Sequence, residues 1–167
     1  MTSGVPVTTE PGRDRAAVDR VRRALLSAGL TETVRTLDAE VPTAAAAARA
    51  LGCELGAIAN SLVFEFDGEP LLILASGAAR VDTGLVGDHL GGGKIRRASP
   101  DFVLAHTGQR VGGVAPVGHP KKLRTVIDLH LRRYPLVWAG AGDHRSMLSI
   151  TYSDLARVTD AQPLEVR

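Results

Sequence analysis

The chain has 167 residues, of which 44% are hydrophobic and 23% are charged, and its formal net charge is +2. A chain of this length buries roughly 70% of the surface that it exposes when unfolded, so we expect one domain with an ordinary apolar core. The single cysteine, Cys53, excludes an internal disulfide and a cysteine-rich zinc site, and one Trp, two Tyr and three Phe are too few for a base-stacking platform.

The N-terminal residues 1–12 are small and polar and include Pro and Gly, so we expect a disordered lead-in. No apolar stretch resembles a signal peptide or reaches membrane-spanning length, which together with the lone cysteine favours a cytoplasmic protein. Apolar residues between positions 13 and 30 recur at helical spacing and predict an amphipathic helix. Residues 33–37 have the composition of a short strand.

An alanine-rich helix and a β-hairpin are predicted next. Thr43 is expected to cap the helix and Gly52 to end it. The apolar runs 58–66 and 71–76 flank Asp67-Gly68, which is a strong hairpin signal.

Alternation along the first strand of the hairpin places Asn60 on the same face as Ile58, Leu62, Phe64 and Phe66. A buried amide needs hydrogen-bonding partners. Asn60 is therefore either a satisfied structural group or part of a pocket wall.

The second half of the chain alternates helices and strands without a regular βα repeat. We expect a helix at 81–90 closed by Gly91-Gly92-Gly93, a strand at 94–97, and a helix from Ser99-Pro100-Asp101 to Gly108. Strands are expected at 124–129, 136–139 and 147–151, followed by a short helix that Ser153 caps and that runs to Val158, and by an edge strand at 164–166. Strands that follow one another between helices favour an α/β (α+β) fold with a mixed, mainly antiparallel sheet surrounded by helices.

Basic residues concentrate in the segment 91–135. Nine Lys and Arg residues stand there against two Asp residues, a local excess of +7, so the rest of the chain carries −5. This distribution suits a polyanionic partner, and it is equally compatible with a solvated charged face.

The segment Val111–Pro120, with the sequence VGGVAPVGHP and here called the glycine-proline loop, combines glycines that free the backbone with prolines that stiffen it. Such a loop can present main-chain N–H groups to developing negative charge, as in an oxyanion hole, or it can be a surface turn between strands. Both interpretations remain open at the level of this motif.

Several common nucleotide-binding, catalytic and metal-binding motifs are absent from the sequence. The run Gly91-Gly92-Gly93-Lys94 is not a phosphate loop, because position 88 is Asp and position 95 is Ile. The chain has no GxGxxG or GxSxG motif, and its five histidines form no HExxH pair, so we expect no metal site. The remaining candidates are neutral polar groups and main chain, which suit a reaction in which the substrate supplies part of the chemistry.

Several runs together are similar to one known family. They are IANSLVF at 58–64, LILASG at 72–77, RVD at 80–82, AHTG at 105–108, the Gly-x-x-x-Pro loop from Gly112 to Pro116, and LVWAGAG at 136–142. In this order they resemble the YbaK/ProX family of aminoacyl-tRNA deacylases, which includes the editing insertion of bacterial prolyl-tRNA synthetases. The resemblance covers residues 41–166, within an expected single domain of residues 13–167.

The resemblance implies a compact domain with a mixed, barrel-like sheet and a pocket for a mischarged amino acid. It implies hydrolysis, without metal or cofactor, of the ester that links a wrong amino acid to the 3′ end of a tRNA, with a ribose hydroxyl helping to activate water. The expected partners are the acceptor end of a misacylated tRNA and, as a further candidate, an aminoacyl-tRNA synthetase, with no membrane. The residues expected at the site are Gly112, Gly113, Pro116 and His119 as catalytic residues and Asn60, Ser61, Ser76, Gly77 and His144 as substrate-binding residues.

One departure from the family pattern affects this expectation. The family usually has lysine where this chain has Asn60, and asparagine keeps the polarity but loses the charge. Two hypotheses follow: a trans-editing deacylase, or a catalytically weakened or inactive relative that binds tRNA 3′ ends or a small aminoacyl-like ligand.

Overall fold

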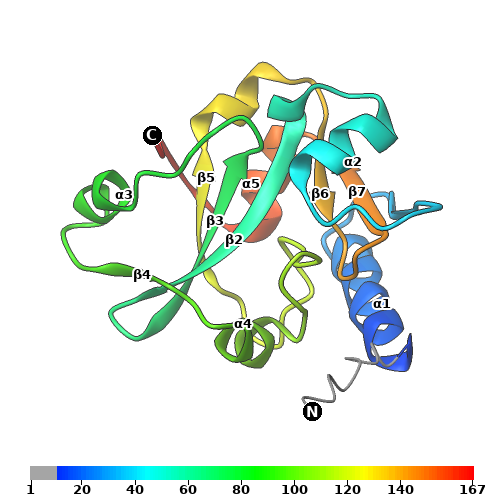
Figure 1. The fold of residues 1–167 in the computed structure, drawn as a ribbon, viewed down its shortest axis with the longest axis horizontal. Helices are drawn as coiled ribbons and strands as arrows, with labels where there is room; N and C mark the ends of the chain where they lie inside the picture. Colours follow the sequence, from blue (N-terminus) through cyan, green and yellow to red (C-terminus); the bar gives the residue numbers. More distant parts are fainter. Residues whose placement is uncertain (1–10) are drawn as a thin grey trace, which may run out of the picture.

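Eight strands form one mixed sheet in the computed structural model, which describes residues 11–167 (Figure 1). The strands are β1 (Arg35–Thr36), β2 (Ile58–Phe66), β3 (Glu69–Ser76), β4 (Ile95–Arg97), β5 (Arg124–Asp128), β6 (Val137–Gly140), β7 (Ser146–Ile150) and β8 (Gln162–Leu164). Their order is β1-β7-β6-β2-β3-β5-β8, with β4 paired to β2. Four pairings are antiparallel and three, β2–β6, β3–β5 and β5–β8, are parallel. The predicted mixed sheet among helices is confirmed.

Strands β2 and β3 form the predicted hairpin, in a register that runs from Ala59↔Ser76 to Phe66↔Glu69. Asp67 and Gly68 connect them with φ values of 50° and 85°. Two successive positive φ angles are the geometry of a two-residue type I′ turn, which the Asp-Gly pair adopts readily. The strand after the turn begins at Glu69, two residues before its predicted start.

The other edge of β2 is only partly covered. Strand β6 pairs with Ile58 and Ala59, and strand β4 pairs with Phe64 to Phe66. Between these two pairings, residues 60–63 have no partner strand on this edge within the described part of the chain. The sheet therefore opens beside the middle of β2.

Five α-helices surround the sheet in the described residues: α1 (Pro11–Ser27), α2 (Ala44–Leu51), α3 (Thr83–His89), α4 (Pro100–Thr107) and α5 (Tyr152–Thr159). Two short 3₁₀ helices, η1 (Leu55–Ala57) and η2 (Leu129–Arg133), complete the fold. None of the helices within residues 11–167 has the length and apolarity needed to cross a membrane.

The helix caps confirm most of the predicted boundaries. The Thr43 hydroxyl accepts from the N–H of Ala46, and Gly52 ends α2 with φ at 67°. Ser99 and Gly108 flank α4 in the same way. For α5 the predicted cap, Ser153, was wrong: the cap is Thr151, two residues earlier, and its hydroxyl accepts from the N–H of Asp154.

Helix α1 is shifted relative to its predicted range of 13–30. It begins at Pro11 and ends at Ser27, and Gly29 follows with φ at 77°. Residues 11 and 12 therefore belong to the helix, whereas the rest of the predicted lead-in lies outside the described residues.

The sheet is buried on both faces, and alternate residues of β3 separate the two apolar clusters. Leu72 and Leu74 pack in one cluster with residues of α1 and α5, and Leu71 and Ile73 pack in the other with α3. Along β2, Leu62, Phe64 and Phe66 join the second cluster and Ala59 and Val63 the first. The predicted alternation of β2 is thus confirmed.

Helix α1 packs tightly against two loops that contain glycine. A Cβ atom at Gly118 would lie 3.0 Å from the main-chain N of Val21, and one at Gly142 would lie 3.0 Å from that of Val18. Arg20 also donates to the carbonyl oxygen of Gly108 at 3.3 Å. Helix α1 thus contacts the turn after α4 at Gly108, the glycine-proline loop at Gly118, and the turn between β6 and β7 at Gly142.

Candidate functional site

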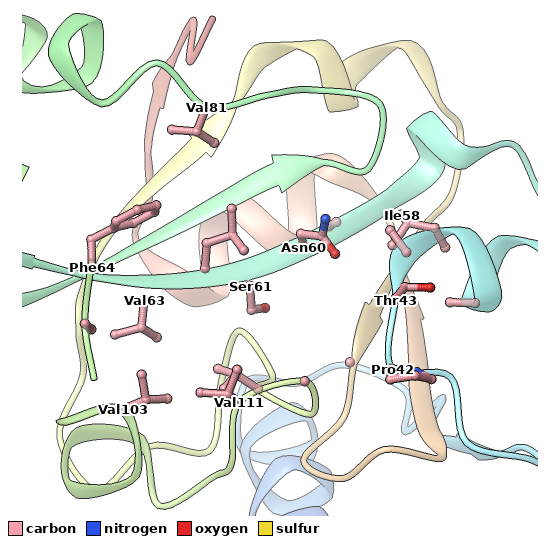
Figure 2. A pocket seen from close by; sticks show the side chains of 18 of the residues that line it. Pro42, Thr43, Ile58, Asn60, Ser61, Val63, Phe64, Val81, Val103 and Val111 are labelled. Carbon is pink, nitrogen blue, oxygen red and sulfur yellow. The ribbon is translucent and has the colours of Figure 1, made fainter. Parts of the chain in front are cut away.

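A pocket of about 850 Å³ opens beside the uncovered edge of β2 (Figure 2). Its walls come from the start of α2, from both sides of β2, from the segments before α3 and α4, from the glycine-proline loop and from β6 and β7. The lining residues are Val41, Pro42, Thr43, Ala44, Ala47, Ile58, Ala59, Asn60, Ser61, Leu62, Val63, Phe64, Ala79, Arg80, Val81, Arg97, Ala98, Pro100, Val103, Val111, Gly112, Val114, Gly140 and Met147.

Figure 2 shows how the two sides of β2 face different parts of the pocket. Ser61 and Val63 lie on the side of Val103 and Val111, whereas Phe64 lies on the side of Val81. Most of the lining is aliphatic, and the described residues that form it include no carboxylate, histidine or cysteine. The pocket can therefore hold an apolar group, and its chemistry depends on a few neutral polar groups.

Main-chain groups of β2 face the opening. The N–H of Gly77 donates to the carbonyl oxygen of Ile58, which makes these two residues a hydrogen-bonded pair of the antiparallel ladder. Such pairs alternate along the strands. In the register observed, Asn60 and Leu62 also bond to β3, so the N–H and C=O groups of Ser61 and Val63 point to the opposite edge. That edge is the one without a partner strand.

Ser61 adds a side-chain group to these main-chain groups. Its hydroxyl oxygen is buried and has no hydrogen-bond partner among the described residues. A buried polar atom without a partner costs free energy, so such groups mark places where a ligand can supply the missing bond. Ser61 is the strongest polar candidate in the pocket.

Two exposed arginines, Arg80 and Arg97, are the charged members of the lining. Within the described residues neither takes part in an ion pair. Arg97 belongs to the basic segment 91–135, but neither arginine was among the predicted site residues. A sequence pattern could not do so, because β4 and the segment before α3 meet β2 only in the folded sheet.

The glycine-proline loop forms the wall opposite Ser61. Gly112 adopts φ at 92°, and the N–H of Gly113 donates to the carbonyl oxygen of Arg110 at 3.0 Å. Within the described part of the chain, no hydrogen bond engages the N–H of Gly112 or of Val114. Both residues line the pocket. These two N–H groups are available to a ligand.

The two histidines near the loop bind main chain. Nε2 of His119 donates to the carbonyl oxygen of Ala115 at 2.8 Å, and Nε2 of His144 donates to that of Val111 at 3.1 Å. Burial lowers the pKa of His119 below its ordinary value of 6.5, and the bond to Ala115 opposes this effect. Neither histidine lines the pocket.

The structure brings three of the predicted site residues to the pocket: Asn60, Ser61 and Gly112. Gly113 does not line the pocket, and its carbonyl oxygen accepts from the N–H of Gly142. Pro116, within the loop, is buried and does not line the pocket.

Ser76 and Gly77 lie outside the lining. The Ser76 hydroxyl donates to the carbonyl oxygen of Gly56, and its N–H donates to the Asp128 carboxylate. A Cβ atom at Gly77 would lie 2.5 Å from the carbonyl oxygen of Leu55. These contacts are structural, and a role for either residue in binding substrate stays a prediction.

No group of three or more His, Cys, Asp or Glu residues within residues 11–167 is arranged to hold a metal ion. Cys53 is half-buried and packs beside α2. Burial raises the pKa of its thiol, which reduces the thiolate fraction and agrees with a packing role.

Comparisons with known proteins agree with the resemblance identified from the sequence. A family model described as an aminoacyl-tRNA editing domain matches residues 38–158. The uncharacterized protein YwhH of Bacillus subtilis is 34% identical over 111 residues, which cover 66% of this chain and 70% of that protein. The proline–tRNA ligase of Nitratidesulfovibrio vulgaris is 31% identical over 140 residues, and the match covers 75% of this chain but only 24% of the ligase.

Solved structures give the same result. The crystal structure of a candidate trans-editing enzyme for prolyl tRNA synthetase superposes with a TM-score of 0.85 at 38% identity, and covers 90% of this chain and 96% of that chain. Hypothetical protein APE2540 superposes with a TM-score of 0.82 at 26% identity.

Proposed function

The chain belongs to the aminoacyl-tRNA editing domain family, and from this membership we propose that it hydrolyses, in trans and in the cytoplasm, the ester that joins a wrong amino acid to the 3′ end of a tRNA. Residues 13–167 would act as one domain in this reaction. The similarity to a candidate trans-editing enzyme along 96% of that protein's chain supports action in trans. The synthetase that mischarges the tRNA is a further candidate partner.

The observation that carries the proposal is the pocket at the uncovered edge of β2. Its aliphatic walls suit an acyl side chain, and the unpaired groups of Ser61 and Val63 suit the polar part of an aminoacyl ester. Arg80 and Arg97 are exposed residues of the pocket lining, and they suit the phosphates of a nucleotide terminus.

The chemistry proposed for this site is attack by water on the ester carbonyl carbon. The bond between that carbon and the ribose oxygen breaks, the ribose oxygen takes up a proton, and the free amino acid leaves with a tRNA that ends in a hydroxyl. The unengaged N–H groups of Gly112 and Val114 would stabilise the negative charge that develops on the carbonyl oxygen.

We infer that a group of the tRNA substrate activates the attacking water. The lining offers two hydroxyls, Thr43 and Ser61, but no histidine or carboxylate that could serve as a general base. Nε2 of His119 is engaged with Ala115, which favours a role in holding the loop. A neighbouring ribose hydroxyl, as the family resemblance implies, would orient the water.

A second function is favoured by one specific residue. Asn60 lies in the pocket where the family usually has lysine, and a site that lost this charge could bind the 3′ end without turnover. The protein would then be a binding relative of the deacylases.

The test is a deacylation assay over a panel of tRNAs charged with wrong amino acids, with release of labelled amino acid as the readout. Hydrolysis of at least one member, absent from an identically prepared Gly112→Ala variant, supports the deacylase. Saturable binding with no turnover for any member supports the binding relative. Absence of both hydrolysis and binding across the panel rejects the two functions together.

A further inference from the structure

Gln109 is a buried polar side chain that neither the family resemblance nor the pocket accounts for. It is 1% exposed and follows Gly108, the residue that ends α4. It lies two residues before Val111, at the start of the glycine-proline loop, and does not line the pocket.

The Gln109 side chain spans the centre of the loop. Its Oε1 accepts from the N–H of Ala115 at 2.6 Å, and its Nε2 donates to the carbonyl oxygen of Val117 at 3.2 Å. A main-chain N–H can only donate and a carbonyl oxygen can only accept, so a single orientation of the amide satisfies both bonds. The side chain thereby fixes the spacing between Ala115 and Val117.

Gln109 is itself anchored to the end of α4. Its N–H donates to the hydroxyl of Thr107 at 3.0 Å, and Thr107 is fully buried. On the other side of the loop, His119 holds the carbonyl oxygen of Ala115. Both main-chain polar groups of Ala115 are therefore held by side chains from the two ends of the loop.

Ala115 directly follows Val114, which lines the pocket and whose N–H has no hydrogen-bond partner among the described residues. We propose that Gln109 is a positioning residue of the editing site: by holding Ala115 from behind, it fixes where the Val114 and Gly112 N–H groups lie relative to the ester. This inference rests on the hydrolase proposed above.

Replacing Gln109 should affect the site differently from replacing a residue that only fills space. Leucine at position 109 would fill nearly the same space but would leave the Ala115 N–H and the Val117 carbonyl oxygen without partners. The loop would then move to reach other partners. A displacement of about 1 Å at a reacting group can lower the rate about a hundredfold, whereas contacts made equally in the ground state are hardly affected.

The test compares Gln109→Leu and Gln109→Glu with Gln162→Leu, a control at an exposed glutamine of β8. The glutamate can accept from Ala115 but, when ionised, cannot donate to Val117. We expect kcat to fall at least tenfold for Gln109→Leu and less for Gln109→Glu, with KM within about twofold of the parent in both, because the loss is confined to the transition state.

Amide hydrogen exchange gives a second readout that does not need activity. In Gln109→Leu, exchange should accelerate at Ala115, whose N–H loses its bond to Gln109, and stay unchanged in β3. If the parent protein hydrolyses no member of the tRNA panel, the proposed function fails, and this exchange pattern still tests the position of the loop. Unchanged kcat and exchange in Gln109→Leu and Gln109→Glu would overturn the proposal, and so would exchange that accelerates equally throughout the protein.

Discussion

His144 lies directly against Gly112: a Cβ atom at Gly112 would be 3.2 Å from Nε2 of the His144 ring. The same nitrogen donates to the carbonyl oxygen of Val111. The turn between β6 and β7 therefore contacts the loop at Gly112, which lines the pocket. An added side chain at Gly112 would press against the His144 ring, and its φ of 92° would strain any residue other than glycine.

Gly112→Ala should lower the deacylation rate at least a hundredfold, because it displaces the loop from the ester. Gly29→Ala is the matched control: its φ is 77°, but an added Cβ would meet no atom within 4 Å. Both variants should lose about 1–2 kcal/mol of stability from the left-handed backbone. Deacylation assays measure the rate, and urea unfolding measures the stability. Equal activity in Gly112→Ala and Gly29→Ala would contradict a role in catalysis for the contact between Gly112 and His144.

Asn60→Lys should raise kcat/KM for the best misacylated tRNA several-fold, because a cation in the pocket attracts the anionic nucleotide terminus. Asn60→Leu, of similar size, should lower it about tenfold by removing the amide. Steady-state kinetics on the same tRNA measure both. A lysine variant no faster than the parent would show that the native asparagine does not weaken the reaction.

Arg80→Ala combined with Arg97→Ala should raise KM several-fold and leave kcat nearly unchanged, since exposed cations contribute mainly to binding. The dependence of log affinity on log salt should become shallower by about 0.7 for each lost phosphate contact. Arg49→Ala, at an exposed arginine of α2 outside the pocket, is the control. An unchanged salt dependence in the double variant would place the tRNA phosphates elsewhere.

His119 should make the protein less stable in mild acid. Its pKa is lowered in the folded state by burial, so below its ordinary value of 6.5 the unfolded chain binds the proton more readily. Its contribution to stability is then complete above 6.5 and is lost as the pH falls toward the lowered folded pKa.

The check is urea unfolding of the parent and of His119→Gln at about pH 7.5 and about pH 5. A glutamine amide can donate to Ala115 without titrating in this range. The parent should lose more stability than the variant on acidification, and parallel losses would assign the effect to other groups.

Arg20→Ala should destabilise the fold by about 1–2 kcal/mol, because it removes a charged donor from the Gly108 carbonyl oxygen. Arg23 is the matched control on the same helix: its side chain is exposed and, among residues 11–167, donates only to the carbonyl oxygen of Asp19. Arg23→Ala should change stability by no more than about 0.5 kcal/mol. Urea unfolding compares the two, and equal losses would mean that the contact with Gly108 adds nothing.

Local signals predicted much of the fold. The Asp67-Gly68 turn, the Thr43 cap and the Gly52 end of α2 each depend on a few adjacent residues, and all three are confirmed. The cap of α5 was missed because Thr151 and Ser153 both carry hydroxyls that can cap a helix. The choice depends on β7 ending at Ile150, which is a feature of the sheet.

The candidate site was predictable only in part. The family resemblance pointed to Ser61 and Gly112, which the structure brings to one pocket. It could not reveal the uncovered edge of β2, because that edge exists only where β4 and β6, distant in sequence, stop pairing. Gln109 had no sequence signal, since its two partners lie in a loop whose path is set by the fold.

The packing of α1 against the glycine-containing loops limits how far the chain can be truncated. The family match begins at residue 38, whereas Val21 and Leu25 of α1 belong to the same apolar cluster as Leu72 and Leu148. A fragment limited to residues 38–158 would expose that cluster to water and leave the glycine turns at 118 and 142 without their neighbour. We expect such a fragment to aggregate, so the smallest portion that folds by itself extends beyond residues 38–158.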